Sequence, residues 1–497
     1  MLKSLPLPAP KLQAITDPAE QNADVLIVGI DDSLKLSGTL QKIDAATGTT
    51  GDGCISRMIH AKKILGKPGE LTLLAAPSNV AATMVLLVGL GPRAEISRGR
   101  FFQAASAAIR KISDQENKRV IIALGESCKP RWHDAIVAGA LFGCEGEAIY
   151  VSEPRIKVPD AIHFSSIDPV QIDRGRVIGE SVNHTRRLVN EPPSVIYPES
   201  FARRATEIAQ SVGLDVEVWD EKKLAEEGCR AMLAVGAGSS KPPRLVILRH
   251  NGGGSKPPVA LVGKGVTFDS GGLSLKPSES MKAMKCDMAG AATVVGVMRA
   301  LAELGVKRNV IGFCGLAENM VSGDSYKLGD VIKTRNGKTI EILNTDAEGR
   351  VVLADTLDVA IGHTPVAMID LATLTGACMV ALGTEVAGLM TNQQVVCESI
   401  ASAAHAEGEP AWQLPMYDLY DDKVKSKVAD IRNIGEGRWG GAITAAKFLE
   451  NFVGDVPWVH IDIAGPAFAD SPLDHRDAGA TGVMVRSLIR WVESISE

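Results

Sequence analysis

Short apolar runs alternate with helix-patterned segments along most of this 497-residue chain, and this alternation most constrains its fold. Apolar strands are expected at residues 24–30, 84–90 and 119–124, with a helix from Arg98 to Ile112. Strands that alternate with helices form βαβ units, which build a largely parallel sheet covered by helices. The sequence therefore predicts an α/β protein.

A helix-breaking segment divides the chain. Residues 171–188 have the pattern of a helix, and the paired prolines of Asn190-Glu-Pro-Pro cannot continue it. We predict a smaller N-terminal α/β domain over residues 1–170, a linker helix over 171–193, and a larger α/β domain over 194–497.

The second part repeats the same rhythm without an internal repeat. Its expected strands are 258–268, 309–314, 339–343, 366–371, 385–390 and 459–463, and its expected helices include 289–304 and an amphipathic closing helix over 481–495.

Composition excludes several classes of protein. A hydrophobic content of 45% and a charged content of 23% indicate a soluble globular chain rather than a disordered or fibrous one. The net charge of −6 gives no global sign of a nucleic-acid or anionic-membrane partner, and no apolar run reaches the roughly 20 residues that cross a bilayer. The eight cysteines form no CxxC pair, and the N-terminus lacks the features of a signal or transit peptide. We therefore expect a cytoplasmic protein with reduced thiols.

Acidic residues gather beside glycine turns at strand ends or loop mouths. They are Asp269 in VGKGVTFDSGG, Asp287 in MKCDMAG, and Asp346 and Glu348 in NTDAEGR. In an extended segment, residues two apart face the same way, so Asp346 and Glu348 are expected to converge. Four carboxylates in one crevice repel one another unless cations compensate them, and two divalent ions are the usual solution. The alternative is that these acids only cap helices and form loop salt bridges.

Basic residues lie among these acids in sequence. Lys264, Lys276 and Arg350 either balance charge or act as an electrophilic clamp on an oxyanion. Other chemical motifs are missing from the sequence, which contains no HExxH and no GxSxG. His460 is interpreted as a core histidine. The turn Gly89-Leu-Gly91 lacks the third glycine of a dinucleotide fingerprint, so we interpret it as a plain strand-to-loop turn.

These motifs resemble those of the cytosolic leucyl aminopeptidase family of dimetal exopeptidases. VGKGVTFDSGG, the Lys276-Pro turn, MKCDMAGAA and NTDAEGR carry the resemblance, and Val351 departs from it conservatively where the motif commonly continues with leucine. The segments Asn190-Glu-Pro-Pro, DLATLTG, Trp439-Gly-Gly and HIDIAG also match, whereas the first 170 residues match only in length and α/β character. The resemblance implies that the larger domain is catalytic, with an α/β/α arrangement and a central mixed sheet.

The resemblance also implies residue roles. Asp269 and Glu348 would be shared by two metals, with Asp346 completing the more exchangeable site and Asp287 and Lys264 the tighter one. The implied metals are Mn²⁺ or Zn²⁺, with Mg²⁺ or Co²⁺ as alternatives at the exchangeable site. Lys276 would stabilise the gem-diolate oxygen, Arg350 would hold bicarbonate as the general base, and the pocket for the first side chain would be lined by Met284, Thr373, Leu374, Gly376 and Ala464.

The implied activity is release of N-terminal residues, preferably Leu and other apolar residues, from short peptides. A water shared by the two metals would attack the scissile carbonyl. The implied assembly is a homohexamer of two stacked trimers. Three alternatives remain open at this point: a two-metal phosphoesterase, a physiological role as a Cys-Gly dipeptidase in glutathione turnover, and an added DNA-binding function, which the absence of a basic stripe in residues 1–170 disfavours.

Overall fold

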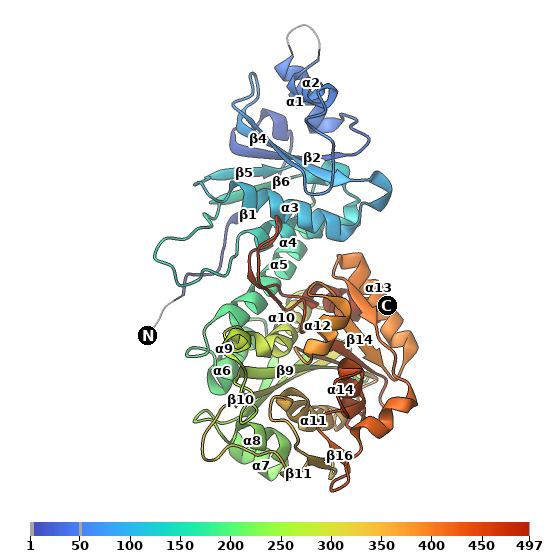
Figure 1. Ribbon diagram of the computed structural model, residues 1–497. Helices are drawn as coiled ribbons and strands as arrows, with labels where there is room; N and C mark the ends of the chain where they lie inside the picture. Colours follow the sequence, from blue (N-terminus) through green and yellow to red (C-terminus); the bar gives the residue numbers. More distant parts are fainter. Residues whose placement is uncertain (1–3, 49–51, 497) are drawn as a thin grey trace. The chain divides into compact units, whose positions relative to one another are not determined.

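The computed structural model describes residues 4–48 and 52–496, which form two compact α/β units (Figure 1). Unit 1 runs to Asn183 and also includes residues 406–408 and 470–479, and unit 2 contains the other described residues. The boundary between the units falls inside helix α5 (Pro169–Asn190). Two units that each contain a sheet flanked by helices confirm the predicted two-domain α/β class.

Unit 1 contains a six-stranded sheet in the order β1-β6-β5-β2-β4-β3. Every neighbouring pair is parallel except β3 and β4, in agreement with the expected largely parallel sheet. The strands are β1 (Lys11–Ile15), β2 (Ala23–Asp31), β3 (Leu71–Ala75), β4 (Ala82–Gly91), β5 (Arg119–Ile122) and β6 (Ala161–Ser165). The helices are α1 (Gly38–Thr47), α2 (Cys54–His60), α3 (Arg98–Ile112), α4 (His133–Gly143) and the first part of α5.

Strand β2 shows why this part of the sequence is so apolar. Val25 and Ile27 pack with α3 and α4 in one buried cluster, whereas Leu26, Val28 and Ile30 pack with α1 and α2 in another. Successive side chains of a strand point to opposite faces, so a strand covered on both faces needs a continuous apolar run.

Unit 2 contains an eight-stranded mixed sheet in the order β15-β14-β17-β13-β9-β10-β8-β7. Strands β17, β13, β9 and β10 are parallel to one another at its centre, and β8, β7 and β14 are attached by antiparallel pairing. The strands are β7 (Asp215–Trp219), β8 (Arg244–Asn251), β9 (Val259–Asp269), β10 (Asn309–Asn319), β13 (Ala367–Ala372), β14 (Ala387–Thr391), β15 (Ala411–Gln413) and β17 (Trp458–Asp462).

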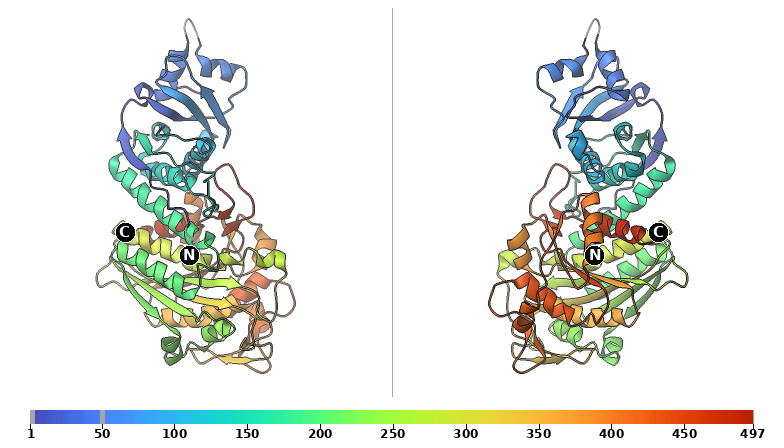
Figure 2. Two further views of the ribbon diagram at one scale, coloured as in Figure 1. Left: turned by 90° about the vertical axis from the view of Figure 1, so that its left-hand side faces the viewer. Right: turned by 90° about the vertical axis from the view of Figure 1, so that its right-hand side faces the viewer.

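Helices cover both faces of this sheet (Figures 1 and 2). A Cβ at Gly312 of β10 would meet α10, and a Cβ at Gly315 would meet α8 and α11 on the other side, so small residues let the helices approach closely. The helices are α6 (Pro198–Ser211), α7 (Glu221–Glu226), α8 (Arg230–Gly236), α9 (Ser278–Met281), α10 (Ala289–Glu303), α11 (Glu348–Ile361), α12 (Gly376–Leu382), α13 (Gln394–Glu407), α14 (Gly441–Glu450) and α15 (Val485–Ser494), with the 3-10 helix η5 (Met284–Met288) before α10.

Two expected elements differ from the structure. The segment expected as a strand at 339–343 is the short β12 (Thr339–Glu341), which pairs with β11 (Val331–Lys333) and β16 (Ile431–Arg432) in a small separate sheet. The closing helix begins at Val485 rather than at residue 481, because Met484 has a left-handed backbone conformation with a φ of 65°. The Glu409 carboxylate accepts hydrogen bonds from the backbone N–H groups of Met484 and Ser487 at 3.1 and 3.0 Å, which caps α15.

Within the described part of the chain, no helix is both long and apolar enough to cross a membrane.

Candidate active site

Strand β9 provides two of the candidate residues. Lys264 lies within the strand and Asp269 at its carboxyl end, and each is only 2% exposed. The strand lies between β13 and β10, which are both parallel to it. The carboxyl ends of adjacent parallel strands form the usual ligand-binding edge of an open α/β sheet.

Lys264 joins two of the acidic segments. Its Nζ lies 2.7 Å from Asp287 Oδ1 on η5 and 2.9 Å from Glu348 Oε1 on α11, and it donates a hydrogen bond to the Thr373 carbonyl at 3.0 Å. Burial opposes the charge on Lys264, but the carboxylates of Asp287 and Glu348 outweigh it and raise the pKa of the ammonium. A Cβ at Gly349 would lie 2.4 Å from Lys264 Cε, so only glycine permits this approach.

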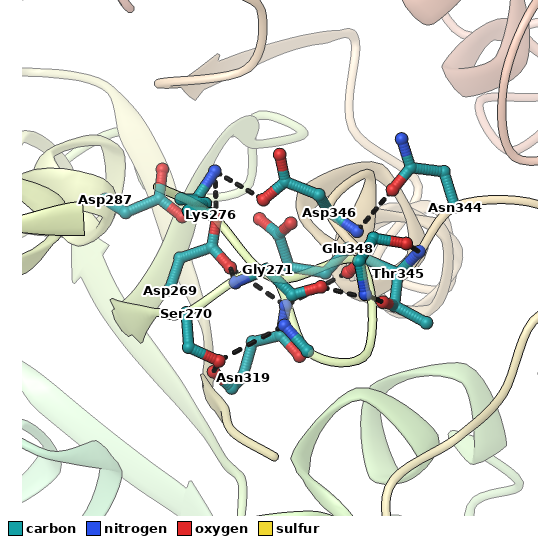
Figure 3. Close-up of polar contacts among 12 residues, drawn as sticks. Asp269, Ser270, Gly271, Lys276, Asp287, Asn319, Asn344, Thr345, Asp346 and Glu348 are labelled. Carbon is teal, nitrogen blue, oxygen red and sulfur yellow. Dashed lines mark hydrogen bonds and ion pairs between the residues drawn. The ribbon is translucent and has the colours of Figure 1, made fainter. Parts of the chain in front are cut away.

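Lys276 joins Asp269 to Asp346, which lies in the same segment as Glu348 (Figure 3). Its Nζ lies 2.9 Å from Asp269 Oδ2 and forms an ion pair with Asp346. The turn that follows β9 brings Lys276 back, because Gly271 and Gly272 adopt left-handed conformations with φ values of 86° and 62°. Burial lowers the pKa of Lys276, but the neighbouring carboxylates reverse this effect and raise it overall.

The carboxylates of Asp269, Asp346 and Glu348 form one cluster. One oxygen of each carboxylate lies within 4.8 Å of the others. The segment of Asp346 and Glu348, which was expected to be extended, is not extended in the structure. Asn344 Oδ1 accepts a hydrogen bond from the Asp346 N–H at 2.8 Å, and Glu348 is the first residue of α11. Convergence of Asp346 and Glu348 therefore results from a turn into a helix.

Three aspartates of the site are costly to ionise as they stand. Burial raises the pKa of Asp269, Asp287 and Asp346. Lys264 and Lys276 offset this effect only in part at Asp269 and Asp346, and Lys264 does so at Asp287. Asp287 Oδ2 and Glu348 Oε2 are buried and have no hydrogen-bond partner among the described residues. Unpartnered buried oxygens are unfavourable, and oxygen-rich sites are what hard divalent cations prefer. These residues therefore fit a divalent metal.

Arg350 lies in the first turn of α11, the helix that begins with Glu348. It follows Glu348 by two residues in α11, is buried, and donates a hydrogen bond from Nη1 to the Asn433 carbonyl at 3.0 Å. Burial lowers its pKa to about 10, against the opposing effect of Glu348 and Asp462. Its Nε has no hydrogen-bond partner within the described residues, so a donor remains for a small anion.

The candidate pocket residues follow the ends of β13 and β17 or lie on short helices. Thr373 Oγ1 donates to Asp287 Oδ1 at 2.7 Å, which joins it directly to the acidic site. The backbone N–H groups of Leu374 and Ala464 both donate to Asp462 Oδ1, at 3.3 and 3.1 Å, so these two residues lie together. Met284 begins η5, three residues before Asp287, and Gly376 begins α12.

Two supporting residues were not predicted from the sequence. Asn319, at the end of β10, is fully buried and donates from Nδ2 to Asp269 Oδ1 at 2.8 Å and to the Thr345 carbonyl at 3.0 Å (Figure 3). It therefore orients Asp269 and holds the segment that precedes Asp346. The available signal was a polar residue that ends a strand parallel to β9. Asp462, which ends β17, was missed for the same reason.

His460 lies in the core, as expected, but within a polar network. Its Nδ1 lies 2.6 Å from Asp370 Oδ1, and Trp458 Nε1 donates to Asp370 Oδ2 at 2.7 Å. All three side chains are fully buried between β13 and β17. The two hydrogen bonds compensate the buried Asp370 carboxylate. His460 Nε2 is also buried, and it has no hydrogen-bond partner among the described residues.

Comparisons with known proteins agree with this geometry. The catalytic-domain pattern of the cytosol aminopeptidase family matches residues 183–489, and the N-terminal-domain pattern of that family matches residues 27–144. A probable cytosol aminopeptidase from Rhodopirellula baltica is 59% identical over 100% of this chain and 99% of its own length. Another from Aquifex aeolicus is 41% identical over 88% of this chain and 90% of its own length.

Solved structures lead to the same class. A mutant of tomato leucine aminopeptidase superposes with a TM-score of 0.88 at 32% identity, covering 99% of this chain and 98% of that one. The bottromycin maturation enzyme BotP in complex with Mn superposes with a TM-score of 0.84 at 36% identity, covering 96% of this chain and 100% of that one. Fold and site together define a peptidase, a hydrolase of peptide bonds. The chain belongs to the cytosol aminopeptidase family, and its activity is that of an aminopeptidase.

Proposed function

We propose that this chain is a metal-dependent aminopeptidase that releases Leu and other apolar residues from the N-termini of short peptides. The observation that carries the proposal is the set of buried carboxylates with unpartnered oxygens on Asp287 and Glu348. Buried like charges destabilise a fold unless cations compensate them, so this arrangement is retained for a function. The manganese complex of a structural relative supports the same proposal.

The proposed ligands for two divalent ions are Asp269, Asp287, Asp346, Glu348 and Lys264. Bound ions would supply Lewis-acid activation of the scissile carbonyl and of a water molecule. Their identity is proposed as Mn²⁺ or Zn²⁺, with Mg²⁺ or Co²⁺ at the more exchangeable site. The hydrogen bonds from Asn319 to Asp269 and from Thr373 to Asp287 would fix the orientation of these carboxylates.

The proposed catalytic residues are the two cations that are not metal ligands. Lys276 would donate a hydrogen bond to the oxygen that gains negative charge in the transition state. Arg350 would hold bicarbonate, which would take the proton of the attacking water, and its unpartnered Nε supports this role. Met284, Thr373, Leu374, Gly376 and Ala464 would line the pocket for the first side chain.

Assembly and location complete the proposal. We propose a homohexamer from the family resemblance, and unit 2 exposes several large apolar side chains that an assembly could cover, among them Val380 at 90%, Trp439 at 75% and Trp412 at 67%. A cytoplasmic location is proposed from the family description.

The test is a panel of aminoacyl-p-nitroanilides and dipeptides assayed with Mn²⁺, Zn²⁺, Mg²⁺, Co²⁺ or a chelator. Leu and Met substrates should be cleaved fastest, N-acetyl-Leu peptides should resist cleavage, and the chelator should abolish activity. Cys-Gly in the panel tests the glutathione role, and p-nitrophenyl phosphate tests the phosphoesterase alternative. Full activity in chelator would contradict the proposal.

A further inference from the structure

Unit 1 contains a cavity of about 560 Å³ at the carboxyl edge of its own sheet. Its lining includes the last residues of β2 and β4 and the segment that follows β5. In this sheet, the chain passes from β2 to the edge strand β3 and then to β4, which is the neighbour of β2, and it returns to β5 on the other side of β2. Such a reversal opens a crevice outside the strand ends, where open α/β sheets bind ligands.

Three cationic side chains line this cavity. Lys35 and Arg93 are exposed, and neither forms an ion pair within the described residues. Lys129 is also exposed, and its Nζ lies 4.6 Å from the ring centre of Trp132, which belongs to the same lining. Arg and Lys are the side chains that proteins use to bind phosphate groups.

The two acidic residues of the lining are occupied by donors of the protein itself. Asp31 Oδ1 accepts a hydrogen bond from the Ser33 N–H at 3.0 Å. Glu126 accepts one from the Thr39 N–H at 2.8 Å, at the N-terminus of α1. These carboxylates therefore satisfy local backbone groups, and the three cations remain available for an anionic ligand.

The rest of the lining suits an organic body. Ile96 contributes partly exposed apolar surface and Trp132 a partly exposed aromatic ring, above the buried Leu40 and Leu90. The volume lies within the roughly 300–1,000 Å³ range of small-molecule sites and can accommodate a mononucleotide-sized compound. An inorganic anion alone would leave the apolar surface uncovered.

We propose that this cavity binds a small organic phosphate about the size of a nucleoside monophosphate. Its phosphate group lies near Lys35, Arg93 and Lys129, and its organic body covers the apolar part of the lining. The turn Gly89-Leu-Gly91 has no phosphate-binding fingerprint, so side-chain cations rather than a glycine-rich loop provide recognition. The inference does not depend on the peptidase site.

Calorimetric titration of the full-length chain with AMP tests this inference, with adenosine and inorganic phosphate as separate fragments. AMP should bind one site per chain more tightly than either fragment. Its affinity should fall between about 50 and about 200 mM salt, because exposed charges are screened. Adenosine that binds as tightly as AMP would overturn the proposed phosphate recognition.

Variants locate the site. The double substitution Lys35→Ala/Arg93→Ala should weaken AMP binding at least about tenfold, because charge-assisted hydrogen bonds are lost. Lys118→Ala is the matched control, since Lys118 is exposed at the opposite end of β5 and should keep the wild-type affinity. Failure of AMP to bind at about 10 mM, or equal affinity in the double variant and the wild type, would overturn the inference.

Discussion

Both units place charged side chains at the carboxyl ends of parallel strands, but these side chains differ in burial. In unit 2, Lys264, Asp269 and Glu348 are at most 2% exposed. In unit 1, Lys35 and Glu126 are exposed around an open cavity. Burying charge costs solvation free energy, and a chain retains it only where partners or function compensate. Similar sheets thus provide two ligand-binding edges, and only one has the buried charge typical of catalysis.

Hydrogen bonding of the acids shows the same difference. In unit 1, Glu126 satisfies a helix N-terminus, so its charge has a local structural use. In unit 2, Asp287 and Glu348 each keep a buried oxygen without a partner in the described chain. An acid that satisfies the backbone needs no ligand, whereas an acid with an orphaned oxygen needs a cation.

The largest expected effect comes from making the same substitution, Glu to Gln, at the carboxyl ends of the strands in each unit. Glu348→Gln removes a proposed metal ligand. The loss in kcat/KM should therefore exceed the roughly 10²–10³-fold loss that follows removal of a single preorganised hydrogen-bond donor. Glu126→Gln makes the same chemical change in unit 1 and should leave kcat/KM unchanged. Steady-state kinetics with elemental analysis of bound metal measure both. Equal losses in the two variants would mean that burial does not distinguish the edges.

A smaller effect on activity should distinguish Lys264 from Lys276, the two lysines of the candidate site. Lys264→Ala should lower metal content, chiefly at the tighter site, and activity with it. Lys276→Ala should keep both metals and lose about 10²–10³-fold in kcat with little change in KM, because its partner charge develops only in the transition state. Lys282→Ala removes an exposed lysine after α9 and serves as the control.

Metal stoichiometry, measured together with steady-state kinetics, distinguishes a metal ligand from a hydrogen-bond donor to the substrate. Loss of a metal from the Lys276 variant, or normal metal affinity in the Lys264 variant, would reverse the assignment.

Buried acids outside the two edges should respond to pH in opposite directions. In unit 2, burial raises the pKa of Asp355 to about 6, because only backbone N–H groups compensate it. The native state then binds the extra proton between the unfolded pKa, about 3.9, and pH 6, so stability falls as pH rises through this window, by up to about 3 kcal/mol.

Asp134 of unit 1 should behave conversely. Burial would raise its pKa, but ion pairs with Arg98 and Arg174 outweigh burial and lower it. Its stabilisation is therefore complete above the unfolded pKa of about 3.9 and is lost as pH falls through the lower folded value. Thermal midpoints of wild type, Asp355→Asn and Asp134→Asn from pH 3 to 7 measure how the stability contributed by each aspartate changes with pH. Slopes of the same sign would refute this contrast.

The smallest expected effect is on catalysis from the cavity of unit 1. Lys35→Ala/Arg93→Ala should leave kcat/KM for a Leu p-nitroanilide within about twofold of wild type, because exposed substitutions outside the site have small effects. A larger change would show that the two edges are functionally coupled.

Local pattern was enough to predict much of this molecule. The apolar run of β2 and the helix pattern of α3, Arg98 to Ile112, predicted the α/β class, because each pattern reflects a period imposed by the backbone itself. The ordered motifs around Lys264, Asp269, Asp287 and Glu348 indicated the family for a similar reason, since the residue types and their spacing are present in the chain before it folds.

Only the tertiary structure determined which groups meet. Asn319 contacts Asp269 across 50 positions of sequence, and Thr373 contacts Asp287 across 86, because β10 and β13 flank β9 in the sheet. The turn that brings Asp346 beside Glu348, and the left-handed Met484 that delays α15, also depend on hydrogen bonds or backbone conformations that periodicity does not encode. Sequence alone determined the candidate chemistry, and the strand order of two sheets determined where charge is buried and where it remains exposed to solvent.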